Sequence, residues 1–116
     1  MKMKVFAKGE TLLRQGESGS SMYYLMAGKV GVYLDYGTPS EKKLSELTEQ
    51  QFFGEMSLLS GESRSATVVA LEDDTCAQEI SKENFKEFCA DHPDQVFAIM
   101  QQLSERLRKA TGAVQS

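Results

Sequence analysis

The sequence predicts a mainly β protein, an antiparallel sandwich or roll, that ends in α-helices. Short runs rich in β-branched and aromatic residues fill the first two thirds of the chain and glycines separate them, which is the pattern of antiparallel sheets. Apart from a short helical run at residues 55–60, helical periodicity begins only after residue 81. A chain of 116 residues is long enough to close one hydrophobic core. We therefore predict a single domain over residues 1–116, with a β body over 1–80 and C-terminal helices over 81–111.

The predicted strands follow one another closely and are separated by turn residues. Gly9, Gly16, Gly19 and Gly28 stand between the early runs, where a turn needs positive φ or a close approach of two backbones. The polar segment 36–41 predicts the tip of a hairpin. The predicted strands are residues 4–7, 11–14, 22–27, 29–36, 42–48, 65–71 and 75–80.

Helices are predicted at three places. Residues 55–60 form a short helix that Gly61 stops, because glycine readily takes the left-handed conformation of a helix end. Ser81 is suited to cap a helix through residue 90. Pro93 suits the first position of the next helix, since its missing N–H is no loss there.

The last helix carries a stripe of apolar side chains that can be interpreted in two ways. Its side chains recur in alternating steps of four and three, the period of a coiled coil. The stripe consists of Val96, Met100, Leu103, Leu107 and Ala110. A homodimer through this helix is one expectation, and packing of the stripe on the β body is the other.

Composition argues against several classes of partner. The 13 Lys+Arg and 17 Asp+Glu give a net charge of -4, and basic residues cluster only at Arg106, Arg108 and Lys109. Nucleic acid is bound by dense basic surfaces, so no direct nucleic-acid partner is expected. The apolar runs are too short for a membrane span or a secretory signal, which predicts a cytoplasmic protein with no membrane partner. Cys76 and Cys89 are expected to be free thiols that pack as small buried hydrophobes.

The segment 53–68 carries the chemistry of an anion site. Gly54 lets the backbone approach a ligand, and the first helical turn after it offers free N–H groups. Arg64 supplies a planar fork of donors for two phosphate oxygens, and Ser65 adds a hydroxyl. Glu55 would repel a phosphate unless it accepted a hydrogen bond from a neutral donor, and a ribose 2'-hydroxyl is such a donor. The residues therefore describe a site for a phosphorylated ribose.

This segment, which reads FGEMSLLSGESRSATV, resembles the phosphate-binding cassette of the cyclic nucleotide-binding domain family. The resemblance covers nearly the whole chain and is close to bacterial cAMP receptor proteins. It implies an eight-stranded antiparallel β-roll, of the double-stranded β-helix or jelly-roll type, with flanking helices. It also implies a sensor module that binds cAMP, or cGMP as the second choice. Our hypothesis is that binding is coupled to a rearrangement of the C-terminal helix. No catalysis, metal or further cofactor is expected.

The resemblance also implies roles for individual residues. Arg64 pairs with the cyclic phosphate and Glu55 accepts from the ribose 2'-hydroxyl. Contacts around the same groups come from Gly54, Ser65 and Ala66, and contacts to base and sugar come from Val32, Leu44 and Ser45. Thr111 reaches the purine edge from the last helix. Met56 suits either core packing or the edge of the purine pocket.

The chain departs from the family pattern in three ways. A glycine is common shortly before the FGE motif, whereas this chain has Glu49, Gln50 and Gln51, so the turn there is built differently. A DNA-binding helix-turn-helix domain is not expected after Ser116, and DNA binding is not carried over. The N-terminal helical segment common in relatives is likewise not expected here, and their usual route of signal transmission is not carried over.

Two other functional classes compete with the sensor. Small β-rolls include metal-dependent cupin enzymes, which need several histidines, and His92 is the only histidine of the chain. Its place beside Pro93 at a helix start fits a capping role better than metal binding. A protein-interaction or dimerisation module that keeps the fold without binding nucleotide is the stronger alternative. The sequence does not predict which effector protein the module would regulate.

Overall fold

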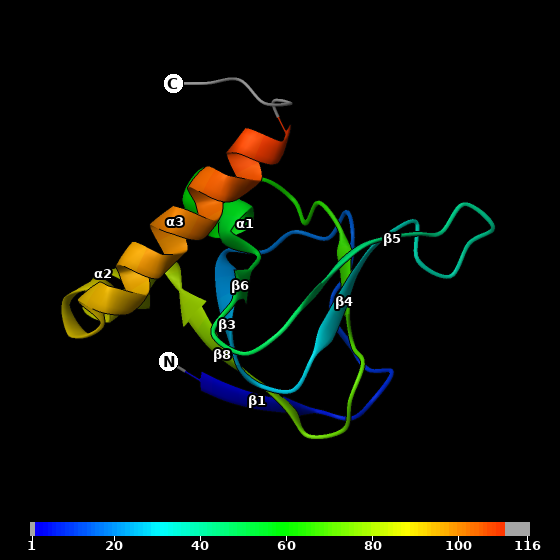
Figure 1. Cartoon of the computed structure of the whole chain (residues 1–116), viewed down its shortest axis with the longest axis horizontal. Helices are drawn as coiled ribbons and strands as arrows, with labels where there is room; N and C mark the ends of the chain where they lie inside the picture. Colours follow the sequence, from blue (N-terminus) through cyan, green and yellow to red (C-terminus); the bar gives the residue numbers. More distant parts are fainter. Residues whose placement is uncertain (1, 111–116) are drawn as a thin grey trace.

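The computed structural model describes residues 2–110, which form two four-stranded sheets with helices packed at one side (Figure 1). The strands are β1 (Lys2–Phe6), β2 (Thr11–Leu13), β3 (Ser21–Ala27), β4 (Val30–Leu34), β5 (Lys42–Leu47), β6 (Phe52–Phe53), β7 (Thr67–Ala70) and β8 (Thr75–Ser81). The helices are α1 (Glu55–Ser60), α2 (Lys82–Asp91) and α3 (Pro93–Ala110).

Every strand pair is antiparallel. One sheet has the order β1-β8-β3-β6 and the other has the order β2-β7-β4-β5. The eight-stranded antiparallel roll with C-terminal helices is therefore confirmed. Only β6 was not predicted from the residues, because two residues show no periodicity. Its pairing with β3 is stabilised by Phe53, whose ring stacks on Tyr23 with centroids 5.4 Å apart.

Strand β3 explains how the two halves of the core are joined. Side chains alternate across a strand, and the first five residues of β3 are buried on both faces. Tyr23 and Leu25 point between the two sheets, whereas Met22 and Tyr24 point toward the helices. The helix side is closed by Leu58 of α1, Phe88 of α2 and Ile99 of α3. The helices thereby cover the outer face of the sheet that contains β3 and β8.

The helix boundaries follow the predicted signals. Gly61 ends α1 at φ 70°, and its N–H donates to the carbonyl of Ser57. The Ser81 hydroxyl accepts from the N–H of Asn84 at the start of α2. Pro93 is the first residue of α3. No helix among residues 2–110 combines the length and hydropathy that a bilayer crossing needs.

The predicted apolar stripe of α3 is divided by the packing. Val96 and Leu103 pack against the helix-side core, but Met100 and Leu107 are 59% and 65% exposed. The reason is that buried Ile99 faces the β body, which rotates Met100 and Leu107 toward solvent. Of the two expectations for the stripe, packing on the β body is therefore wrong for these two residues, and the homodimer through α3 stays a prediction. The side chain of Ala110 lies outside the described part.

The turn before β6 is built without glycine. Gln50 itself takes the left-handed conformation, with φ 70°. The turn is closed by the Gln51 side chain, whose Oε1 accepts from the N–H of Thr48 at 2.8 Å, while the N–H of Gln50 donates to the Leu25 carbonyl. This confirms the predicted difference in turn construction. The two cysteines are free as expected, but both are partly exposed rather than buried.

Candidate functional site

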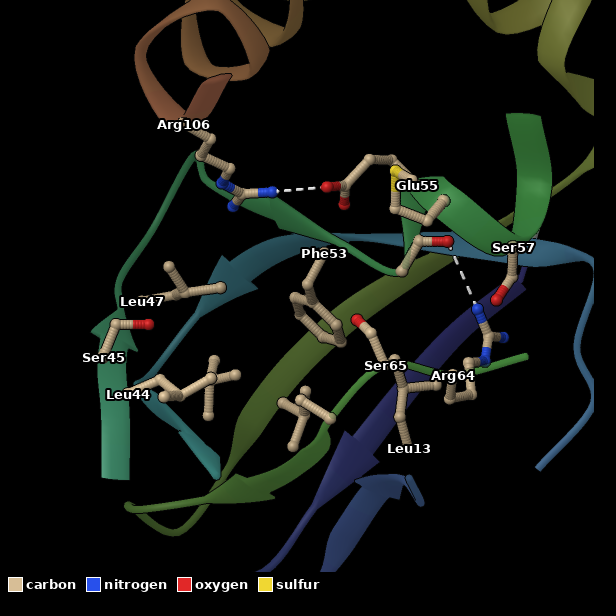
Figure 2. A pocket seen from close by; sticks show the side chains of 15 residues that line it. Leu13, Leu44, Ser45, Leu47, Phe53, Glu55, Ser57, Arg64, Ser65 and Arg106 are labelled. Atoms are coloured by element: carbon tan, nitrogen blue, oxygen red, sulfur yellow. Dashed lines mark hydrogen bonds and ion pairs between the residues drawn. The ribbon is translucent and has the colours of Figure 1, made fainter. Parts of the chain in front are cut away.

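A pocket of about 180 Å³ lies between the sheet that contains β4, β5 and β7 and the segment from β6 into α1 (Figure 2). All predicted site residues within the described range line it, namely Val32, Leu44, Ser45, Gly54, Glu55, Met56, Arg64, Ser65 and Ala66. Thr111, the remaining predicted contact, lies outside the described residues. The rest of the wall comes from Leu13, Leu47, Phe53, Ser57, Val68 and Arg106. The site thus combines an apolar floor with a few convergent polar groups, which is typical of small-molecule sites.

Gly54 shapes the approach to the pocket. It precedes α1 in the left-handed conformation, with φ 81°. A Cβ at this position would lie 3.0 Å from Nη1 of Arg64 and 3.3 Å from Cδ1 of Leu13. Glycine is therefore required both by the backbone angle and by the close approach of the arginine.

Arg64 is a buried cation held by neutral groups. The residue is 7% exposed. Its Nη1 donates to the carbonyls of Ser21 (2.7 Å) and Gly54 (3.2 Å), and its Nη2 donates to the Ser21 hydroxyl (3.4 Å). Burial lowers the pKa of the Arg64 guanidinium, and the nearby Tyr23 and Glu79 oppose that shift. Within residues 2–110 no carboxylate forms an ion pair with it, so the site holds a desolvated positive charge that an anion would stabilise.

Glu55 lies on the same pocket and is engaged from the last helix. Arg106 of α3 donates from Nη1 to Glu55 Oε1 at 2.8 Å, and from Nη2 to the carbonyl of Phe52 at 2.8 Å. Its guanidinium also lies 4.8 Å from the centroid of the Phe52 ring. Figure 2 shows Arg106 reaching from α3 to Glu55. Glu55 is 8% exposed, and within the described residues its second carboxylate oxygen has no partner.

Arg106 was not among the predicted site residues. The sequence did contain a signal, because Arg106 follows Ile99 and Leu103 at helical spacing on the face of α3 that packs inward. An arginine on an otherwise apolar face needs an acceptor. Its neighbours Arg108 and Lys109 instead indicate an exposed basic cluster, which gives no sign of the link between Arg106 and the pocket.

The fold and the site define a β-roll with a pocket in which a buried guanidinium and a buried carboxylate face a small apolar cavity. The sequence model described as "Cyclic nucleotide-binding domain" matches residues 3–92. The chain therefore belongs to the cyclic nucleotide-binding domain family, whose fold is regulatory.

Two curated relatives and one solved structure illustrate the match. The chain is 34% identical over 99 residues to the cAMP-activated global transcriptional regulator CRP of Salmonella typhimurium, covering 84% of this chain and 47% of that protein. It is 32% identical over 88 residues to human cGMP-dependent protein kinase 2, covering 75% of this chain and 12% of the kinase. The catabolite activator protein of Thermus thermophilus superimposes with a TM-score of 0.80 at 30% identity, covering 95% of this chain and 51% of that one. This chain thus spans less than half the length of these curated relatives.

Proposed function

We propose that this protein binds cAMP in the pocket between Arg64 and Glu55 and acts as a regulatory module without catalysis of its own. The observation that carries the proposal is the buried Arg64 guanidinium, which has no anionic partner among residues 2–110 and shares its pocket with a carboxylate. A cyclic nucleotide supplies the phosphate for one and the ribose hydroxyl for the other.

The proposed pose places each part of the ligand against a group of suitable chemistry. The cyclic phosphate accepts from Arg64 and from Ser65. The ribose 2'-hydroxyl donates to the carboxylate oxygen of Glu55 that Arg106 leaves unpaired. The base lies over Leu44, which is 46% exposed and loses that exposed apolar surface when a ring covers it.

Arg106 supplies a physical link from the ligand to α3. It donates to Glu55, so a sugar hydroxyl on the same carboxylate changes the environment of a side chain anchored in the last helix. Two arrangements of α3 would then differ in their affinity for the nucleotide, and binding would shift the population toward the tighter one. This is how the proposed module couples ligand binding to its C-terminal helix.

cAMP is preferred to cGMP in this proposal. The two relatives differ in the nucleotide they respond to, since one is cAMP-activated and the other is cGMP-dependent. Serine at position 65 is compatible with either purine, whereas threonine is the residue associated with cGMP preference in some family members. The absence of threonine at this position favours cAMP.

A protein-interaction role is the second candidate, favoured by a specific surface. Phe97, Met100 and Leu107 of α3 are exposed by 61%, 59% and 65%. These side chains stand on one helix at coiled-coil spacing, which suits self-association into a homodimer through α3.

A thermal-shift experiment separates the two candidates. At a nucleotide concentration about 100 times the dissociation constant, binding adds about 2.7 kcal/mol of stability and raises the melting temperature by on the order of 10 °C. We expect this shift with cAMP, a smaller one with cGMP and none with linear 5'-AMP. No shift with either cyclic nucleotide would reject the sensor and favour the interaction module.

A further inference from the structure

A cluster of polar side chains lies beside Arg64 without lining the pocket. It consists of Ser21 and Tyr23 on β3, Glu79 on β8 and Lys4 on β1. The register explains the cluster, because Tyr23 lies opposite Glu79, and Ser21 stands two residues from Tyr23 on the same face of the strand. The Glu79 carboxylate accepts from the Ser21 hydroxyl at 3.0 Å and from the Tyr23 hydroxyl at 3.1 Å.

We infer that Glu79 is a positioning residue for Arg64 and that it acts through Ser21. Together they hold the guanidinium in place for the phosphate before a ligand arrives. The inference rests on the proposed function, which assigns Arg64 to the phosphate, and it adds a residue from β8 to the machinery of that site.

The direction of the hydrogen bonds supports this assignment. An ionised carboxylate only accepts, so the single proton of the Ser21 hydroxyl must point toward Glu79. The lone pairs of the same oxygen then face Arg64, whose Nη2 donates to it at 3.4 Å. The Ser21 carbonyl meanwhile accepts from Nη1 at 2.7 Å, so one residue receives both ends of the fork.

The backbone beside Ser21 completes a close fit around the arginine. A Cβ on Gly19 would lie 2.6 Å from Cζ of Arg64, so the guanidinium packs directly on this glycine. The segment 19–21 thus forms a cradle: a flat contact at Gly19 and two acceptors at Ser21. A side chain with this many torsions loses considerable entropy on ordering, and a cradle that orders it in advance lowers the cost of binding.

The charge of Glu79 does not cancel that of Arg64. Lys4 forms an ion pair with Glu79 at 3.3 Å. Burial alone would raise the pKa of Glu79, but hydrogen bonds from Ser21, Tyr23 and Lys4 hold it below its ordinary value. The carboxylate is therefore ionised at neutral pH and directed toward the cradle, while Lys4 offsets its negative charge.

The test is a double-mutant cycle on the full chain with cAMP as the titrant. Ser21→Ala removes the hydroxyl, and we expect it to weaken cAMP binding about tenfold, the effect of losing one hydrogen bond to a charged group. Glu79→Gln should weaken binding by a similar factor. The double variant should be no weaker than Ser21→Ala alone, because Glu79 acts through that hydroxyl. Ser21→Thr keeps the hydroxyl and should restore binding to within about threefold of wild type.

Two controls separate positioning from a structural role. Glu46→Gln removes a partly exposed carboxylate that also pairs with lysines, and it should leave cAMP affinity unchanged. The second is the NMR signal of the Arg64 side-chain Nε–Hε group in the absence of nucleotide, identified by its loss in Arg64→Lys. It should move in Ser21→Ala and in Glu79→Gln, and it should stay in place in Glu46→Gln.

The outcomes are distinct. Additive effects of Ser21→Ala and Glu79→Gln, or a ligand-free Arg64 signal that neither variant moves, would overturn the positioning role. A wild-type protein that binds neither cAMP nor cGMP would overturn the proposed function instead. In that case the ligand-free NMR signal of Arg64 would still test whether Ser21 and Glu79 position the guanidinium. A signal that moves in Ser21→Ala and Glu79→Gln supports this role, and a signal that stays in place contradicts it.

Discussion

Replacing Arg64 by alanine should weaken cAMP binding by about 2 to 5 kcal/mol, which is roughly 30-fold to several thousandfold in the dissociation constant. The variant removes a charge-assisted fork from a buried position, where each hydrogen bond to the phosphate is stronger than it would be in water. Isothermal titration calorimetry measures the change directly.

The matched control for this variant is Arg14→Ala. Arg14 is exposed, so the substitution removes the same charge from the surface and should change the dissociation constant by less than about twofold. A melting temperature for each variant establishes that both are folded. Equal cAMP affinity in Arg64→Ala and wild type would remove Arg64 from the site.

Replacing Gly28 by alanine should have the largest effect on folding. Gly28 joins β3 to β4 at φ 88°, and an added Cβ would lie 2.5 Å from Oγ1 and 2.8 Å from Cα of Thr75. Thr75 is fully buried and its hydroxyl donates to the carbonyl of Glu72, so it has no free direction in which to move. Backbone strain and overpacking together are expected to cost about 2 to 5 kcal/mol of unfolding free energy.

Gly9→Ala isolates the backbone part of that cost. Gly9 has φ 91°, close to that of Gly28, but apart from Gly9 and its two chain neighbours no atom of residues 2–110 lies within 4 Å of the position its Cβ would take. Its variant should therefore lose only about 1 kcal/mol, the cost of the left-handed conformation. Urea unfolding of the two variants and wild type gives both numbers. Equal destabilisation by the two substitutions would contradict the close contact between Gly28 and Thr75.

Much of the fold could be predicted because its signals are local. Ser81, Pro93 and Gly61 mark helix ends through their own backbone chemistry, and each stands where the structure begins or ends a helix. Strand β6 could not be found in this way, because two phenylalanines carry no period and pair with β3 only after the chain has folded.

The division of the α3 stripe into packed and exposed side chains also depends on the folded structure rather than on local sequence. Periodicity places Met100 and Leu107 beside Val96, but it does not say which side of the stripe meets the β body. That orientation depends on Ile99 entering the helix-side core. The orientation of α3 is therefore set by tertiary packing, and the spacing of apolar residues along the helix does not predict it.

The candidate site was predicted to the extent that it lies in one segment. Glu55, Arg64 and Ser65 all stand in the segment 53–68, so one motif reveals them together, and all three line the pocket. Arg106 and Glu79 come from α3 and β8, and they reach the site or its arginine only through the fold. Side chains that support a site from distant elements give no signal at short spacing.

The central claim is that Arg64 and Glu55 hold the two ends of one cyclic nucleotide. The most direct measurement is a crystal structure of this protein grown with cAMP. We expect a phosphate oxygen within hydrogen-bond distance of the Arg64 guanidinium and the ribose 2'-hydroxyl on the Glu55 carboxylate. A nucleotide bound elsewhere on the protein, with both of these side chains still making only the contacts described above, would contradict the claim.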